Sequence, residues 1–177
     1  CICIAGFQKV KENQEFSQMA NHNYRIHLTQ AEVKRIDSSR THLNKILINP
    51  LGVDTKIAGD LSKKINDYYK KIEAKVKENF VLAVDLMLTT SPEFFKNDGE
   101  TWYKNGKIKP EFQKKVDDWV AVQIEFVKKE FGASAIKSAV LHLDETTPHI
   151  HFLITPEETK EVKFKNTHRS EEHTSEL

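Results

Sequence analysis

Three histidines stand close together in the segment 142–152, which reads HLDETTPHIHF. Residues two apart in a β-strand point to the same face, so His149 and His151 are predicted to lie side by side, about 6.6 Å apart along the chain. A preceding strand that pairs back through the short turn brings His142 across from them. Three imidazoles that converge in this way can bind a first-row metal and leave positions open for a substrate. The spacing predicts a catalytic metal site, and the ligands alone do not choose among zinc, manganese, nickel and iron.

The elements that must position these histidines follow from the hydrophobic periodicity. The pattern predicts strands over residues 2–8, 80–88, 135–143 and 149–155, helices over 16–22, 55–79 and 109–131, a short helix at 91–93, and a loop over 97–108. This order predicts an α+β fold, with an antiparallel sheet and the two long helices packed on one face. The segment 80–88 is nearly all apolar, which indicates a central strand buried on both faces.

The composition is that of one globular domain. The chain has 177 residues, of which 38% are hydrophobic and 30% charged, with a formal net charge of +1. These values exclude a disordered chain, and no apolar run approaches the roughly 20 residues needed to cross a bilayer. No secretory signal opens the chain, so we expect a cytoplasmic protein with Cys1 and Cys3 as reduced thiols on an edge strand. The charge is compatible with nucleic-acid binding and does not establish it.

Both ends of the chain are expected to differ from those of a native protein. There is no initiating Met, which indicates a start within a reading frame. The last residues, 169–177 (RSEEHTSEL), resemble the translation of a sequencing-adapter oligonucleotide. We therefore expect one catalytic domain over residues 1–168, truncated at both ends, and a non-native tail.

The segment 142–152 closely resembles the metal-binding signature of the Mob/Pre (MobV-type) family of plasmid mobilisation and recombination relaxases, which are His-hydrophobic-His endonucleases. Two upstream segments carry the same resemblance in the right order. Residues 21–25 (NHNYR) resemble the first family motif, and residues 37–44 (DSSRTHLN) resemble the second. The family usually has amide and acidic residues where this chain has Val33, Lys34 and Arg35, so the details of DNA contact are expected to differ.

The resemblance implies the relaxase fold and a DNA-nicking reaction. One strand of plasmid DNA is cut at an origin of transfer by transesterification, which leaves the 5′ end joined to the protein and a free 3′-hydroxyl. The ion at His142, His149 and His151 is expected to be Mn²⁺, with Mg²⁺ or another first-row metal as alternatives. The expected nucleophile is His22, with Tyr24 as the alternative; Tyr24 can also be a packing or base-stacking aromatic.

Further roles follow from the same resemblance. Glu145 is expected to orient His22 and accept its proton. Phosphate or DNA contacts are expected from Arg25, Arg40 and Asn44, although both arginines can instead form surface ion pairs. Asp144 and His42 are expected beside the metal ligands, and Asp144 is equally interpreted as a turn residue.

The expected partner is plasmid DNA, single-stranded at the nick region, and any coupling or dimerisation partner is expected to bind a C-terminal region beyond this chain. Two rival interpretations remain open at this point. One is a metal-dependent phosphodiesterase or hydrolase in which metal-bound water attacks the phosphate. The other is a fragment that binds DNA without turnover.

Overall fold

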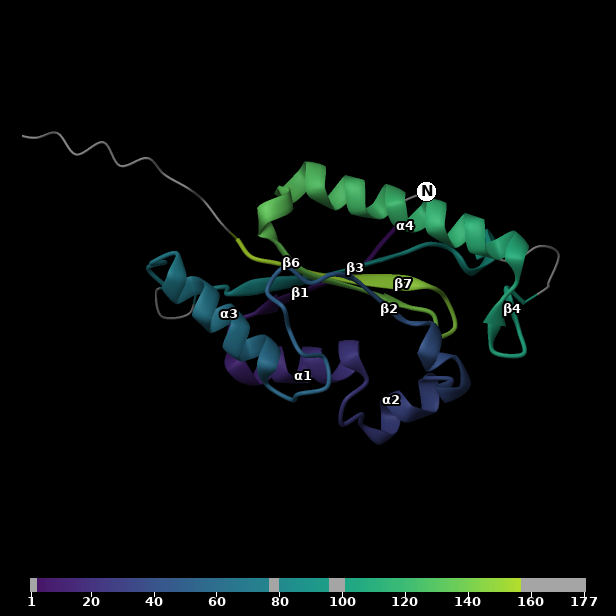
Figure 1. The fold of residues 1–177 in the computed structure, drawn as a ribbon, viewed down its shortest axis with the longest axis horizontal. Helices are drawn as coiled ribbons and strands as arrows, with labels where there is room; N and C mark the ends of the chain where they lie inside the picture. The colour runs from purple at the N-terminus through teal and green to yellow at the C-terminus, as the bar shows by residue number, and fades with distance from the viewer. Residues whose placement is uncertain (1–2, 77–79, 96–100, 157–177) are drawn as a thin grey trace, which may run out of the picture.

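The structure is a computed structural model that describes residues 3–76, 80–95 and 101–156. Its centre is a five-stranded antiparallel sheet with helices above and below it (Figure 1). The strand order is β1-β3-β7-β6-β2, made by β1 (Cys3–Val10), β2 (Lys45–Ile48), β3 (Ala83–Thr89), β6 (Ile136–His142) and β7 (His149–Ile154). The predicted α+β class is confirmed.

The helices and a small hairpin complete the fold. The α-helices are α1 (Asn13–Tyr24), α2 (Gln30–Arg35), α3 (Asp60–Lys71) and α4 (Pro110–Phe131). Three short 3₁₀ helices are η1 (Ser38–Leu43), η2 (Pro92–Phe95) and η3 (Ala133–Ala135), and a separate hairpin pairs β4 (Tyr103–Lys104) with β5 (Lys107–Ile108). In the described part of the chain, none of the helices has the length and apolar character of a membrane span.

The two long helices lie on opposite faces of the sheet, which differs from the predicted arrangement on one face. Helix α4 covers one face, and α3 lies with α1 on the other (Figure 1). On β7, Phe152 packs into the cluster beneath α4, whereas the next residue, Leu153, packs into the cluster with α1 and α3. Because strands of this sheet carry apolar side chains on both faces, each face needs its own covering layer.

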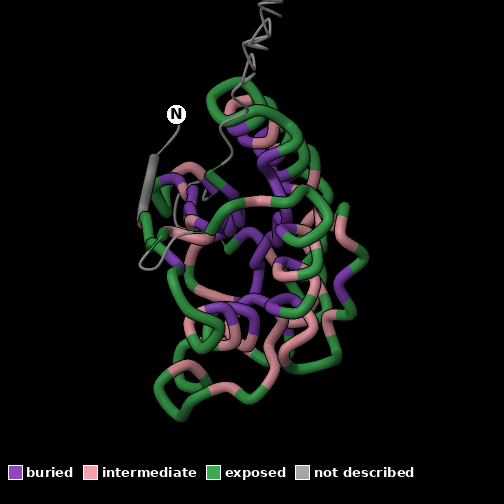
Figure 2. The backbone as a smooth tube through the Cα atoms, turned by 90° about the vertical axis from the view of Figure 1, so that its left-hand side faces the viewer, coloured by how far each residue is buried: buried purple, intermediate pink, exposed green. Residues whose placement is uncertain are grey.

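The burial pattern places strands β6 and β7, which carry the three predicted histidine ligands, within this layered core. All six residues of β7 and all seven of β6 are buried, and Figure 2 shows buried positions gathered inside the molecule with exposed positions around them. The middle strand of the sheet is therefore β7, and the predicted central strand 80–88 corresponds to β3 beside it. Polar side chains on a strand buried to this degree need specific partners.

Several predicted boundaries differ from the observed ones. The predicted helix 55–79 is the shorter α3, which begins after Gly59, a residue with φ of 83°. The predicted loop 97–108 contains the β4–β5 hairpin, whose turn residues Asn105 and Gly106 have positive φ angles of 52° and 69°. Positive φ at both central positions is the requirement of a tight hairpin turn, and an Asn-Gly pair meets it. Residue 1 and the tail 169–177 lie outside the described residues.

Candidate metal centre

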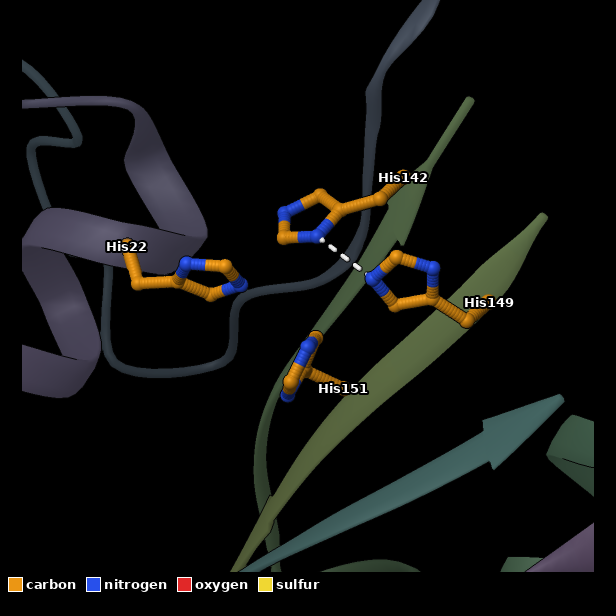
Figure 3. Close-up of side chains that lie close together, drawn as sticks. All are labelled: His22, His142, His149 and His151. Carbon is orange, nitrogen blue, oxygen red and sulfur yellow. Dashed lines mark hydrogen bonds between the residues drawn. The ribbon is translucent and has the colours of Figure 1, made fainter. Parts of the chain in front are cut away.

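Four histidines meet on the sheet face that carries α1. His142 on β6 and His149 on β7 are direct cross-strand partners, and His151 follows two residues along β7. His22 projects from α1 toward these three rings (Figure 3). One nitrogen of each ring can be chosen so that all four lie within 4.8 Å of one another. The hairpin predicted from the sequence thus brings its three histidines together, and the structure adds His22 to them.

A hydrogen bond to one nitrogen fixes the orientation of each sheet histidine. His142 Nε2 lies 2.9 Å from the main-chain oxygen of Asn23, and His149 Nδ1 lies 2.9 Å from that of Thr147. His151 Nδ1 lies 2.9 Å from a carboxylate oxygen of Asp85. A carbonyl or carboxylate oxygen only accepts, so each of these nitrogens carries the hydrogen and the other ring nitrogen carries a lone pair.

The remaining nitrogens fit a bound cation. His142 Nδ1 and His149 Nε2 are 3.2 Å apart, with no hydrogen left to share between their lone pairs. Two nitrogens that bind one ion at about 2.1 Å stand roughly 3.0–3.4 Å apart in octahedral or tetrahedral geometry. His151 Nε2 is buried and has no hydrogen-bond partner among the described residues. Three lone pairs, one of them on an orphaned buried nitrogen, are the donor set that a first-row divalent metal prefers.

Burial favours the neutral form of His22, His142 and His149. Burial, with the nearby Arg25 and histidines, lowers the pKa of His142 far below its ordinary value. Burial and the neighbouring His151 lower the pKa of His149 to about 4. Burial also lowers the pKa of His22, helped by His151 and Arg25 and opposed by two glutamates. All three rings are therefore neutral near pH 7, with lone pairs available.

Asp85 was not predicted from the sequence as a site residue. Asp85 is buried on β3 and forms a hydrogen bond with His151. His151 therefore has a carboxylate as its acceptor, whereas each of the other two sheet histidines has a main-chain oxygen. A carboxylate behind a ligand imidazole holds the ring in place and makes the other nitrogen a better donor. The signal in the sequence was a lone acidic residue in the apolar run FVLAVDLML.

Glu32 is the carboxylate that orients His22. Its Oε1 lies 3.0 Å from His22 Nδ1, while its Oε2 accepts from the main-chain N–H and the hydroxyl of Thr29, each at 2.7 Å. These bonds from Thr29 hold the pKa of Glu32 well below its usual range. Glu145, the expected partner, lies 3.8 Å from His22 Nε2, which exceeds a hydrogen bond. The signal for Glu32 was the capping-box spacing Thr29-x-x-Glu32 at the start of α2.

Tyr24 lies away from the histidine cluster. Its hydroxyl is 3.2 Å from the hydroxyl of Ser138 on β6, and burial raises the pKa of the phenol. A phenol that is harder to ionise is a weaker nucleophile. The geometry therefore matches the packing interpretation of Tyr24.

Arg25 forms a buried ion pair rather than an open phosphate clamp. Its Nε and Nη2 donate to the two carboxylate oxygens of Asp144 at 3.0 and 2.6 Å. Its Nη2 also donates to Glu145 at 2.8 Å, and its Nη1 donates to the main-chain oxygen of His22 at 2.8 Å. One further N–H remains on Nη1, which lies 3.5 Å from His22 Nε2. Asp144 thus binds Arg25 and no histidine. Burial acts to raise the pKa of Asp144, but the hydrogen bonds and charge of Arg25 outweigh burial, so the pKa lies below its ordinary value.

The second motif, residues 37–44, supports the turn that carries Glu145. Arg40 is buried and donates to the main-chain oxygen of Leu143 at 2.8 Å. Asn44 accepts from the main-chain N–H of Leu143 at 2.7 Å and donates to Asp144 at 2.8 Å. Both expected DNA-contacting side chains are thus occupied by the turn.

His42, expected beside the ligands, is exposed instead and lies near Gly106 of the hairpin turn. The structure therefore does not bring His42 to the histidine cluster.

A cleft of about 630 Å³ opens over the site. Its lining includes His22, His149 and His151, so the cluster is accessible from it. Lys34 and Arg35 at the end of α2 line the same cleft. A substrate in this cleft would contact both the histidines and these two cations.

The fold and the arrangement of the histidines resemble those of a solved relaxase domain. A five-stranded antiparallel sheet carries a His-hydrophobic-His pair on its middle strand and a third histidine opposite, and the architecture matches a solved relaxase domain. The family model described as plasmid recombination enzyme (Mob_Pre) matches residues 2–175. The chain belongs to this family.

Individual relatives agree with the family assignment. The chain is 28% identical over 143 residues to plasmid recombination enzyme type 3 of Staphylococcus aureus, covering 81% of this chain and 29% of the relative. It is 29% identical over 132 residues to a 65 kDa protein of Zymomonas mobilis subsp. mobilis, covering 74% of this chain and 20% of the relative. The chain therefore spans less than a third of the length of these curated relatives.

A solved structure shares the fold. The MobM relaxase domain (MOBV; Mob_Pre), bound to plasmid pMV158 oriT DNA in a Mn-bound crystal structure, superposes with a TM-score of 0.67 and 25% identity. The match covers 91% of this chain and 73% of that chain.

Proposed function

We propose that this chain is a DNA relaxase domain that nicks one strand of plasmid DNA at an origin of transfer by metal-assisted transesterification. The observation that supports it most is the convergence of His22 with three histidines whose free nitrogens face one point. The similarity to the Mn-bound MobM domain with oriT DNA supports the choice of Mn²⁺ and of plasmid DNA as substrate.

His142, His149 and His151 are the proposed ligands. A divalent metal bound there would polarise the phosphoryl oxygens and offset the negative charge that grows in the transition state. Asp85, Asn23 and Thr147 supply the acceptors that keep the three rings aimed.

His22 is the proposed nucleophile. Its Nδ1–H donates to Glu32, so Nε2 carries the lone pair that would attack the scissile phosphorus. The bond from phosphorus to the 3′ oxygen breaks, the 5′ end stays on His22 as a phosphoramidate, and the 3′ oxygen takes a proton from water. The ring becomes positively charged, and the carboxylate of Glu32 stabilises it. In this tautomer Nε2 carries no proton for Glu145 to accept, and Glu145 lies 3.8 Å away from it.

Arg25 serves mainly to position His22. Its bonds to Asp144 and to the main-chain oxygen of His22 hold the end of α1 against the turn. Its Nη1 also lies 3.5 Å from His22 Nε2.

Covalent capture tests the proposal. The chain is incubated with Mn²⁺ and a randomised single-stranded DNA library, denatured, and digested, and nucleotide-modified peptides are identified by mass spectrometry. The same assay is run on His22→Ala, Tyr24→Phe and the double variant His149→Ala/His151→Ala. We expect an adduct on His22 that Tyr24→Phe leaves intact and that the double variant abolishes.

The other outcomes separate the rival functions. An adduct on Tyr24 keeps the relaxase reaction and overturns the nucleophile. Cleavage that yields 5′-phosphate products without an adduct indicates a hydrolase that uses water. Binding of Mn²⁺ and DNA with neither adduct nor cleavage indicates a DNA-binding fragment.

A further inference from the structure

Two cationic side chains at the end of α2 line the cleft without an acidic partner among the described residues. Lys34 and Arg35 are exposed and line the same cleft as His22 and His149. Within the described ranges, no acidic side chain forms an ion pair with either of them. Exposed cations without a carboxylate partner, at the mouth of a cleft, are available to an anionic ligand.

The arginines expected to hold phosphates are committed elsewhere. Arg25 has a side chain only 6% exposed and is bound to Asp144 and Glu145. Arg40 has a side chain 7% exposed and is bound to Asp37 and to main-chain oxygens of the turn. A DNA strand in the cleft therefore needs other cations for its backbone.

The charge around the cluster leads to the same conclusion. Four carboxylates lie around the histidines. Asp85 binds His151, Glu32 binds His22, and Asp144 and Glu145 share one guanidinium, that of Arg25. Acidic side chains therefore outnumber the one arginine among them. Lys34 and Arg35 add positive charge to the cleft, which favours a polyanion there.

Helix α2 is fixed relative to the cluster, so its cations hold a defined place. Glu32 bonds His22 at 3.0 Å, and just beyond the helix the main-chain N–H of Asp37 donates to the main-chain oxygen of Asp144 at 2.7 Å. Arg35 follows Glu32 by three residues, which places both on one side of the helix. The same element thus orients the proposed nucleophile and presents Arg35 to the cleft.

We propose that Lys34 and Arg35 bind the phosphodiester backbone of the DNA strand beside the scissile phosphate. The inference rests on the proposed function for the identity of the cleft's substrate. The Arg35 guanidinium suits two oxygens of one phosphate, and the Lys34 ammonium acts as a point charge. Such contacts position the strand without reading its sequence.

Salt-dependent binding tests the inference. Fluorescence anisotropy of a fluorescein-labelled (dT)25 strand is measured with the chain in Mn²⁺ at several KCl concentrations. The test variant is Lys34→Gln/Arg35→Gln. The control Lys128→Gln/Lys129→Gln removes two adjacent exposed cations from α4, on the other face of the sheet. Thermal unfolding of each variant checks that the fold is retained.

We expect the test variant to bind about tenfold more weakly at ~0.1 M KCl, with a salt slope less steep by about 1.4, since each single-strand phosphate contact contributes about 0.7. The control should retain the wild-type slope. Equal slopes for wild type and test variant would overturn the inference, as would equal losses in test and control variants or no DNA binding by the wild type.

Adduct formation separates this result from the proposed function. If wild type forms the His22 adduct while the test variant binds like wild type, the nicking reaction stands and the inference fails. If the test variant loses salt-dependent binding while wild type forms no adduct, the backbone contacts stand and the nicking proposal fails.

Discussion

Arg25 and Asp144 form a two-point ion pair that joins the end of α1 to the turn between β6 and β7. The two bonds measure 3.0 and 2.6 Å, and the residues lie 119 positions apart in the chain. Asp144 has no exposed surface and also accepts bonds from Thr41 and Asn44. The pair thus ties the helix that carries His22 to the hairpin that carries the three proposed metal ligands.

Breaking this pair should destabilise the fold strongly. Asp144→Ala leaves the Arg25 guanidinium buried without its main carboxylate, which is expected to cost about 3–5 kcal/mol. Urea unfolding monitored by circular dichroism measures the change. Asp118→Ala, which removes an exposed ion pair with Lys114 on α4, is the control and should cost less than about 1 kcal/mol. Similar losses in the two variants would contradict the assigned role of Asp144.

Metal should stabilise the fold through the three sheet histidines. At a free Mn²⁺ concentration of about 100 Kd, the gain is about 2.7 kcal/mol, seen as a higher Tm that EDTA reverses. His149→Ala/His151→Ala should abolish the rise in Tm, and the exposed control His42→Ala should retain it. His22→Ala should keep it too, since His22 is proposed as nucleophile; its loss would make His22 a fourth ligand.

Asp85 should set the strength of metal binding from behind His151. Asp85→Asn keeps the shape of the side chain but removes its charge, and we expect Mn²⁺ affinity to fall about 10–100-fold in titration calorimetry. Asp67→Asn, an exposed change on α3, provides the matched control. Wild-type affinity in Asp85→Asn would show that the charge of Asp85 does not act on the metal.

The metal-free fold should weaken as the pH falls below about 6.5. In the folded chain the pKa of His149 is lowered to about 4, whereas in the unfolded chain it is about 6.5. Between these values the unfolded chain binds a proton that the folded chain does not, so the free energy of unfolding falls with pH. Above about 6.5 both states are neutral and this contribution to stability is fully present.

Urea unfolding in EDTA between pH 7 and pH 4.5 measures this dependence. His149→Asn removes the proton that His149 binds on unfolding, so its free energy of unfolding should fall less steeply with pH than that of wild type. The variant thus separates the effect of His149 from that of acidic groups that titrate at lower pH. A wild-type stability that is flat or increases toward pH 4.5 would contradict the assigned burial of the neutral rings.

The sequence by itself determined the features that depend on neighbouring residues. The two-residue spacing of His149 and His151 places both on one face of a strand, and the short turn brings His142 opposite, as the register shows. The predicted helix 109–131 agrees with α4 to within one residue, because Pro110 and Gly132 at its ends each impose a local backbone geometry. The family also followed from motifs contiguous in the chain.

Only the tertiary structure decided which side chains support the histidines. Glu32 meets His22 across 10 residues, and Asp85 meets His151 across 66. The tertiary structure also decided that α3 and α4 lie on opposite faces of the sheet. It buried Arg25 and Arg40 in ion pairs with carboxylates and left Lys34 and Arg35 to line the cleft. Hydrophobic periodicity predicts that a helix has an apolar side, but it does not predict which face of the sheet that side packs against. That choice depends on packing over the whole chain, and the polar contacts of the site depend on that choice.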